Sequence, residues 1–138
     1  METPLSASRM APIFIKGRTM QLTDFLVRLN NNQEEINFAD TIATIDANFL
    51  FTPAAFDNGN VKNEAGQNSG SCKIFAFAHL QGLSSIQTLH CFGDYYRIDV
   101  LKNPGANDHQ NIRNFMTFGW EGICFHGAPL KQKTSVDN

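Results

Sequence analysis

The sequence has little charge, no long apolar run and no closely spaced pair of cysteines. Charged residues make up 17% of the 138 residues, against about 25% in an average soluble domain, and the formal net charge is −2. Because the chain is not basic, we expect no binding to nucleic acid through bulk electrostatics. Because no apolar run reaches about 18 residues, we expect no membrane span. The apolar content of 42% is too high for a disordered chain, so the composition predicts a folded domain.

The cysteines and histidines lack the spacings that are typical of metal sites. Cys72, Cys91 and Cys124 lie 19 and 33 residues apart and form no CxxC pair, which argues against a structural zinc site. Their odd number argues against a disulfide framework and favours a reducing compartment. The sequence therefore predicts neither a metal nor a cofactor.

Asparagine takes the place of charge. The chain has 14 asparagines, and four of them lie in the segment 57–71, where Val61 is the one aliphatic side chain beyond alanine. Asn58-Gly59 predicts a turn inside this segment. A connection of this length without secondary structure is uncommon in a compact domain, and such loops are usually functional or disordered.

Capping residues mark the expected helices in the first half of the chain. Thr23 predicts the start of a helix that ends at the asparagines 30–32, and Asn37 predicts the start of a second. The second helix must end before Pro53, with 49–51 as a short extended piece. Ser71 predicts the start of a third helix, almost entirely apolar and therefore central, with a buried strand as the alternative.

Two further helices and a strand are expected in the second half. Ser84 and Gln87 form a capping box that opens the longest helical stripe, which ends at 103–105. Asn107 predicts the start of a last helix, with Gly119 just past its end. The residues 120–125 are typical of a strand. These patterns predict a single compact α+β domain, helix-rich, with four to five helices and a few short strands.

The two ends of the chain differ from the rest. The residues 1–19 combine prolines, serines and three basic residues, so we expect a poorly ordered extension there and a folded domain over 20–130. The polar residues 131–138 are expected to fray.

The junction Ser71-Cys72-Lys73 is the sharpest candidate for chemistry. A helix N-terminus presents free N–H groups and a positive dipole, and Lys73 adds charge, so a phosphate or carboxylate is a suitable ligand. Gly66 and Gly70 would let the backbone approach it closely. The more common alternative is a loop held by its own asparagine side chains, with Ser71 only a cap.

Cys72 is also a candidate nucleophile. The dipole and Lys73 would both favour its thiolate, and His79, His90 or His109 could serve as the base of a cysteine enzyme. The more common alternative is a small buried apolar residue.

The segment 108–114 is a second polar candidate. His109 and Arg113 are four residues apart and would share one helix face, on which they could hold an acidic ligand. Pairing with aspartate or glutamate elsewhere is the more common outcome. We expect the 57–71 segment to lie over a pocket near these two residues.

Several blocks in a fixed order carry a resemblance to a known family. They are Phe51-Thr-Pro-x-x-Phe-x-Asn-Gly59, Asn63-x-x-Gly-x-Asn-x-Gly-Ser-Cys-Lys73, Phe92-Gly-Asp-Tyr-Tyr-Arg97, Asp99-Val-Leu101, Asp108-His-Gln-Asn-Ile-Arg113 and Gly119-Trp120. The chain resembles the HopJ type III effector family over 20–130. The resemblance implies a small bacterial protein with no established activity, injected into a host cell. The recurring polar residues of the family correspond here to Asn58, Asn63, Asn68, Ser71, Cys72, Lys73, His109, Asn111 and Arg113. Of these we take Asn58, Asn63, Asn68, Ser71, Lys73, Asn111 and Arg113 as candidates for ligand binding, and Cys72 and His109 as candidates for catalysis.

Three functions remain open at this stage. The first is a binding or interaction module whose partner is a host protein or a small anionic ligand. The second is an intracellular enzyme or anion-binding protein that uses the Gly/Asn-rich loop and Cys72-Lys73. The third is a housekeeping protein of the bacterial cytoplasm, favoured by an N-terminus with acidic Glu2 and only two serines in its first 50 positions, because type III signals tend to be serine-rich.

Overall fold

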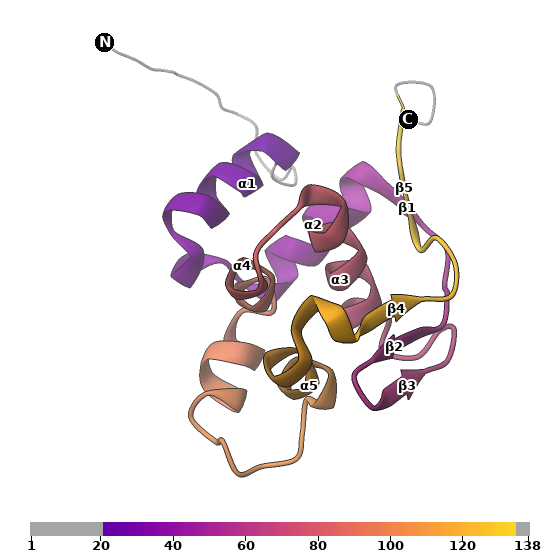
Figure 1. The fold of residues 1–138 in the computed structure, drawn as a ribbon. Helices are drawn as coiled ribbons and strands as arrows, with labels where there is room; N and C mark the ends of the chain where they lie inside the picture. Colours follow the sequence, from indigo (N-terminus) through magenta and orange to yellow (C-terminus); the bar gives the residue numbers. More distant parts are fainter. Residues whose placement is uncertain (1–20, 135–138) are drawn as a thin grey trace.

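The computed structural model describes residues 21–134, and helices dominate this part of the chain (Figure 1). The expected extension at 1–19 lies outside these residues. The α-helices are α1 (Leu22–Asn31), α2 (Phe38–Asn48), α3 (Ser69–Gln81), α4 (Ser85–His90) and α5 (Gln110–Phe118). The 3₁₀ turns are η1 (Gln33–Glu35) and η3 (Gly119–Gly122), and η2 (Tyr95–Val100) is a π-helix. The predicted helix-rich α+β domain is confirmed, and no helix of 21–134 is both long and apolar enough to cross a bilayer.

Five short strands form two small antiparallel sheets on one side of the molecule (Figure 1). One sheet pairs β1 (Phe49–Phe51) with β5 (Leu130–Gln132), and the other has the order β3 (Val61–Asn63), β2 (Phe56–Asn58), β4 (Ile123–Phe125). The extended piece expected at 49–51 is therefore β1. Lys131 and Gln132, expected to fray with the tail, are instead held by pairing with β1.

Helix α3 is the centre of the core. Ile74, Phe75 and Phe77 are fully buried, and the Phe75 ring packs against aromatic rings from four other parts of the chain. A helix covered on all sides shows no amphipathic stripe, as the apolar sequence of this segment predicted. The helix is confirmed over the alternative of a strand, and it ends at Gly82, which has a left-handed φ of 68°.

Two predicted helix caps are confirmed. The side chain of Asn37 accepts a hydrogen bond of 2.7 Å from the Asp40 N–H at the start of α2. Ser84 and Gln87 form the complete capping box of α4. Both caps are formed by residues three apart, so they can be predicted from the sequence alone.

Three predicted helix starts are wrong. Helix α1 begins at Leu22 rather than after Thr23, α3 begins at Ser69 rather than after Ser71, and α5 begins at Gln110 rather than after Asn107. The residues before α3 and α5, Asn68 and His109, have left-handed φ values of 52° and 51°. Neither side chain caps its helix, so the ordinary cap signals do not mark these starts.

Two further elements are shorter than predicted. The long helix expected from Ser84 to 102 breaks after α4 and continues as η2, with Gly93 at φ 63° between them. The strand expected over 120–125 begins at Ile123, because Trp120 lies in η3, where its Nε1 donates to the carbonyl of Leu83.

Candidate functional site

The 57–71 segment is an ordered hairpin followed by the first turn of a helix. Strands β2 and β3 pair with Asn58 opposite Val61, and the turn between them contains Gly59. A turn at Asn58-Gly59 is confirmed, whereas the expectation of a connection without secondary structure is wrong. Hydrogen bonds from polar side chains help to hold this segment, which has few apolar side chains to bury.

Asparagine side chains lock this hairpin to α5. Nδ2 of Asn58 donates to the backbone carbonyl and to Oδ1 of Asn111, at 2.8 and 3.0 Å. The amides of Asn63 and Asn111 exchange two hydrogen bonds, at 3.2 and 3.0 Å. All three residues are buried. An uncharged amide both donates and accepts, so these side chains pair with one another away from water, while Asn58 Oδ1 is buried with no hydrogen-bond partner among the described residues.

Two more asparagines extend this asparagine network. Asn68 donates to Oδ1 of Asn63 at 2.8 Å, which ties the hairpin to the start of α3. Asn114 donates to the carbonyl of Asn58 and to Oδ1 of Asn60, at 2.8 and 2.9 Å. Asn58 and Asn63 therefore help to hold the hairpin in place, in agreement with the interpretation that the loop is held by its own asparagine side chains.

A pocket lies beside this network, between the N-termini of α3 and α5. It encloses about 370 Å³, and we call it the α3–α5 pocket. Its polar lining comes from the two helix starts, and its apolar wall is mainly aromatic. The helix starts contribute Asn68, Gly70, Ser71, His109, Gln110 and Asn111, and the apolar wall consists of Phe38, Phe92, Tyr95, Val61 and Ile112.

The first N–H groups of both helices are free at this pocket. Within residues 21–134, no hydrogen bond engages the backbone N–H of Gly70 or Ser71 in α3, or of Gln110 or Asn111 in α5. The first turn of a helix leaves such donors unpaired by geometry, and no side chain caps them here. The pocket therefore combines two positive helix ends with aromatic surface.

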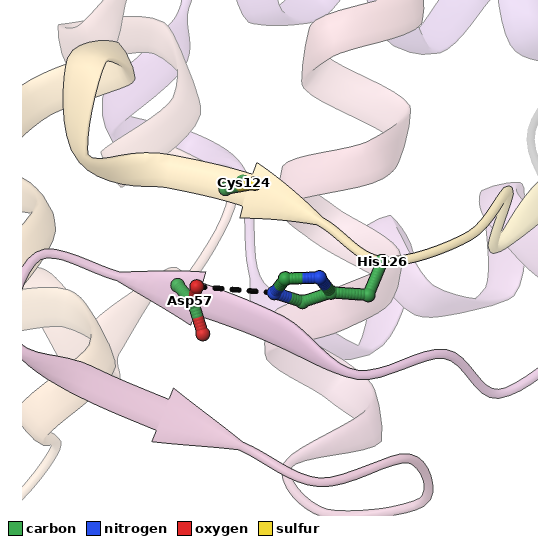
Figure 2. A group of neighbouring side chains, drawn as sticks. All are labelled: Asp57, Cys124 and His126. Carbon is green, nitrogen blue, oxygen red and sulfur yellow. Dashed lines mark hydrogen bonds and ion pairs between the residues drawn. The ribbon is translucent and has the colours of Figure 1, made fainter.

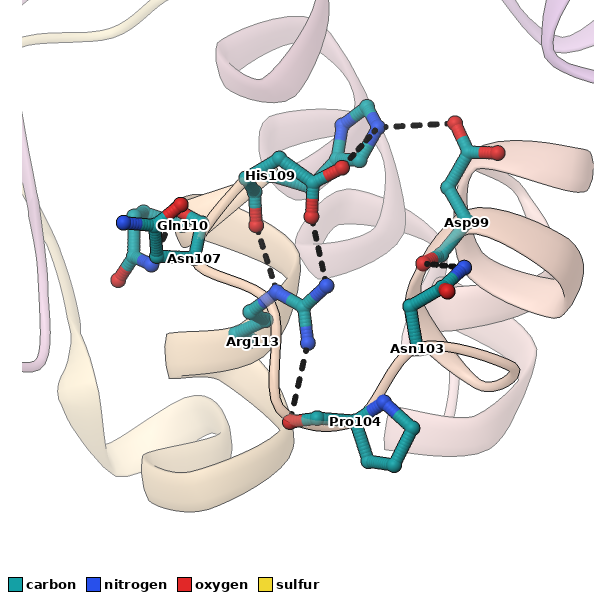
Figure 3. A network of polar contacts seen from close by, with 8 residues as sticks. Asp99, Asn103, Pro104, Asn107, His109, Gln110 and Arg113 are labelled. Carbon is teal, nitrogen blue, oxygen red and sulfur yellow. Dashed lines mark hydrogen bonds and ion pairs between the residues drawn. The ribbon is translucent and has the colours of Figure 1, made fainter.

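His109 and Arg113, at the start of α5, each pair with a nearby aspartate (Figure 3). His109 Nε2 lies 3.0 Å from Oδ2 of Asp99. Arg113 donates to the carbonyl and to the carboxylate of Asp108, both at 2.6 Å. The hydrogen bond from Arg113 lowers the pKa of Asp108. His109 still lines the pocket, whereas Arg113 does not.

Lys73 and Cys72 do not line the pocket. The Lys73 ammonium forms an ion pair of 2.8 Å with Asp46 and lies 5.0 Å from the centre of the Phe51 ring. Cys72 is 2% exposed, and its thiol lies 3.8 Å from the carbonyl of Ala54. Burial raises the pKa of this thiol, so the expectation that the helix dipole and Lys73 favour the thiolate is wrong in direction.

The three histidines considered as a base have other partners. His109 pairs with Asp99, His90 Nδ1 lies 3.0 Å from a nitrogen of Arg97, and His79 packs on Trp120. Burial and the charge of Arg97 lower the pKa of His90. Among the described residues, no hydrogen bond joins any of the three to Cys72.

These environments predict the order in which the thiols react with iodoacetamide. Cys124 is exposed, whereas Cys72 and Cys91 are buried, and burial raises the pKa of Cys91 to about 12. We expect Cys124 to be alkylated first, because the thiolate is the reacting form. The other two thiols should react at least about tenfold more slowly. Mass spectrometry of the native protein measures this order, and Cys72 reacting as fast as Cys124 would restore it as a candidate nucleophile.

A third polar cluster lies on the sheet. Asp57 of β2, Cys124 of β4 and His126 just after β4 lie close together, and Oδ2 of Asp57 is 3.0 Å from Nε2 of His126 (Figure 2). Sequence spacing predicted no metal site and did not reveal this group. Cys124 and His126 are two apart and share a strand face, but their neighbour Asp57 is far away in the sequence.

The structure thus brings together part of the predicted site. Asn68, Ser71, His109 and Asn111 meet at the α3–α5 pocket, and Asn58 and Asn63 support it from the hairpin. The sequence did not indicate the aromatic lining, because Phe38 and Tyr95 lie in α2 and η2, outside the candidate segments 57–71 and 108–114.

Comparisons with known proteins agree with this fold and with the blocks of residues in the sequence. The chain is similar to the crystal structure of an unknown-function protein, VPA0580, with a TM-score of 0.83 and 53% identity, over 87% of this chain and 100% of that one. No curated protein matches the chain. The profile of the family described as HopJ type III effector protein matches residues 22–130, which include both helix starts and the hairpin. With four fifths of its length matched, the chain belongs to the HopJ type III effector protein family.

Proposed function

We propose that the protein is a binding module that takes a small ligand with an acidic group, a carboxylate or a phosphate, in the α3–α5 pocket. One observation carries this proposal: two helix N-termini with unpaired backbone N–H groups line the same cavity. Helix starts of this kind are ready-made anion sites, because the donors are fixed in place and the dipole favours negative charge.

The lining favours a ligand with an apolar part beside its acidic group. The rings of Phe38 and Tyr95 pack edge to face with centres 5.0 Å apart, and the Tyr95 ring lies 5.2 Å from that of His109. Binding pockets of this kind combine apolar and aromatic walls with a few placed polar groups. The acidic group would lie at the helix starts and the apolar part against the rings.

The pocket supports binding better than catalysis. Cys72, the strongest nucleophile suggested by the sequence, lies outside it with a raised pKa. Ser71 lines the pocket, but within residues 21–134 its hydroxyl has no hydrogen bond to a histidine that would activate it. The described residues therefore supply ligand-binding groups without a complete nucleophile and base.

Family membership suggests the cell in which this binding would take place. A member of a family described as type III effectors would act in a host cell after delivery, with the pocket or a surface near it as the point of contact. A translocation reporter fused to the full chain, compared in strains with and without the secretion apparatus, tests delivery separately from ligand binding.

The binding proposal is tested by placing a negative charge in the pocket. Ser71→Asp adds a carboxylate where the ligand's acidic group would lie. The change also suits the dipole of α3, so the fold should be retained. We expect inorganic phosphate and benzoate to shift the amide NMR signals of Gly70, Ser71 and Gln110 in the natural protein. We expect the substitution to weaken the tighter ligand about tenfold or more, as repulsion between close charges predicts.

Ser69→Asp is the matched control. Ser69 belongs to the same helix turn but does not line the pocket, so it adds the same charge elsewhere. We expect its effect on affinity to stay within about threefold, since exposed charges interact weakly in water. Equal losses in the two variants, or no amide shifts with either ligand, would show that the pocket does not bind anions.

A further inference from the structure

The cluster Asp57, Cys124 and His126 is built by strand pairing. Asp57 lies directly opposite Cys124 in the antiparallel ladder of β2 and β4. Directly opposed residues have their Cβ atoms about 4.5–5.5 Å apart on one face of the sheet. His126 follows Cys124 by two residues and therefore points to the same face, and its N–H donates to the carbonyl of Ala55 at 2.9 Å. Figure 2 shows the His126 ring turned toward the Asp57 carboxylate, with Cys124 beside them.

The three ligand atoms are near the separations that a bound metal requires. One oxygen, one sulfur and one nitrogen all lie within 4.8 Å of one another. With zinc bonds of about 2.0–2.3 Å, tetrahedral geometry places ligand atoms about 3.3–3.8 Å apart. The side chains are exposed or half-buried, so small rotations suffice to reach these distances.

We propose that Asp57, Cys124 and His126 bind a divalent cation of the zinc class on the open face of the β3-β2-β4 sheet. Imidazole nitrogen and thiolate sulfur select zinc and similar metals over magnesium and calcium, which prefer oxygen alone. The carboxylate and the thiolate together balance the charge of the ion. Three protein ligands leave the fourth tetrahedral position for water or for a ligand.

Lys62 competes with the metal for Asp57. Its ammonium lies 3.6 Å from Oδ1 of Asp57, but the side chain is 81% exposed and free to turn toward solvent. A bound dication would repel it. The same residues without a metal form an exposed network in which Lys62 and His126 both pair with Asp57. Removal of Lys62 should favour the metal-bound arrangement and weaken the metal-free network, which provides a test.

Cobalt titration of the reduced full-length protein measures this site. Co²⁺ substitutes for zinc and gives a thiolate-to-cobalt absorption band when a cysteine is a ligand. We expect binding of one cobalt per chain with this band, displacement by Zn²⁺, and slower alkylation of Cys124 when zinc is present. Cys124→Ser should abolish the band, and His126→Gln or Asp57→Asn should each weaken binding about tenfold or more.

Two controls separate the site from non-specific binding. His79 is exposed on α3, outside the cluster, so His79→Gln should leave the affinity unchanged. Lys62→Gln should tighten binding about two- to fivefold, the size of an exposed ion-pair effect. No cobalt band, a band that survives Cys124→Ser, or an affinity insensitive to both His126→Gln and Asp57→Asn would overturn the proposal. None of these changes lies in the α3–α5 pocket, so this result is independent of anion binding there.

Discussion

Replacing Gly93 by alanine is expected to destabilise the protein by about 2–5 kcal/mol. Gly93 has a φ of 63°, a conformation that costs a residue with a Cβ about 1–2 kcal/mol. A Cβ added there would lie 2.7 Å from the backbone nitrogen of Phe38 and 3.0 Å from Cα of Asn37. Backbone atoms cannot move aside as a flexible side chain can, so relief of the clash adds a cost of about 1–3 kcal/mol.

Gly82→Ala is the matched control for this prediction. Gly82 has a φ of 68°, but a Cβ there meets no atom within 4 Å. It therefore shows the cost of the left-handed backbone alone, about 1–2 kcal/mol. Urea unfolding of both variants measures the difference. If Gly93→Ala were no more destabilising than Gly82→Ala, the close approach between Gly93 and the start of α2 would not exist in solution.

The break at Gly93 shows which parts of the fold the sequence could predict. The caps at Asn37 and Ser84 were visible because each is made by residues three apart. The break after α4 contains Gly93, which lies against the backbone of residues more than fifty positions earlier. The apolar stripe from Ile86 to Val100 continues through the break, so periodicity alone predicts one long helix.

The same distinction applies to the candidate site. Asn68, Ser71 and His109 were predicted as ligand-binding residues, and they meet because two helix starts converge. Lys73 was equally suitable by residue type, but its position depends on Asp46 of α2. Residue type indicates which ligands a side chain can bind, whereas contacts between residues far apart in the sequence determine whether it lies at the pocket.

The sheet cluster failed to appear in the sequence for a third reason. Cys124 and His126 are two residues apart, so they lie on one face of the sheet. This can be inferred from the sequence only once the segment is known to be extended. Their third partner, Asp57, is set by the register of β2 against β4. A shift of one residue in this register would point Asp57 to the opposite face.

Asn111→Ala is expected to destabilise the protein by about 2–3 kcal/mol. The substitution removes the donor to Asn63 Oδ1, and it takes from the Nδ2 groups of Asn58 and Asn63 one of two acceptors each. Each broken hydrogen bond in a buried network costs about 1 kcal/mol, and the small cavity adds to this. Asn58 keeps the backbone carbonyl of residue 111, and Asn63 keeps the carbonyl of Phe56 and the amide of Asn68, which limits the loss.

Asn111→Asp distinguishes the hydrogen-bond network from simple packing. Aspartate has the same shape and keeps both acceptor contacts, but its second oxygen would meet Oδ1 of Asn63, the acceptor now 3.0 Å from Nδ2 of Asn111. Only the protonated acid can donate there, so the folded state holds the proton more tightly than the unfolded state does. The destabilisation should therefore grow as pH rises above the ordinary carboxyl pKa of about 3.9.

Urea unfolding of Asn111→Asp from about pH 4 to 7 measures this dependence against the natural protein. Asn114→Ala is the control, because Asn114 is only partly buried and donates without accepting in the network. We expect it to cost about 1 kcal/mol, the same at every pH. A cost of Asn111→Asp that does not change with pH would mean that Asn63 Oδ1 does not accept from residue 111. In that case the asparagines would contribute to stability through packing, and contacts other than the asparagine network would hold the hairpin against α5.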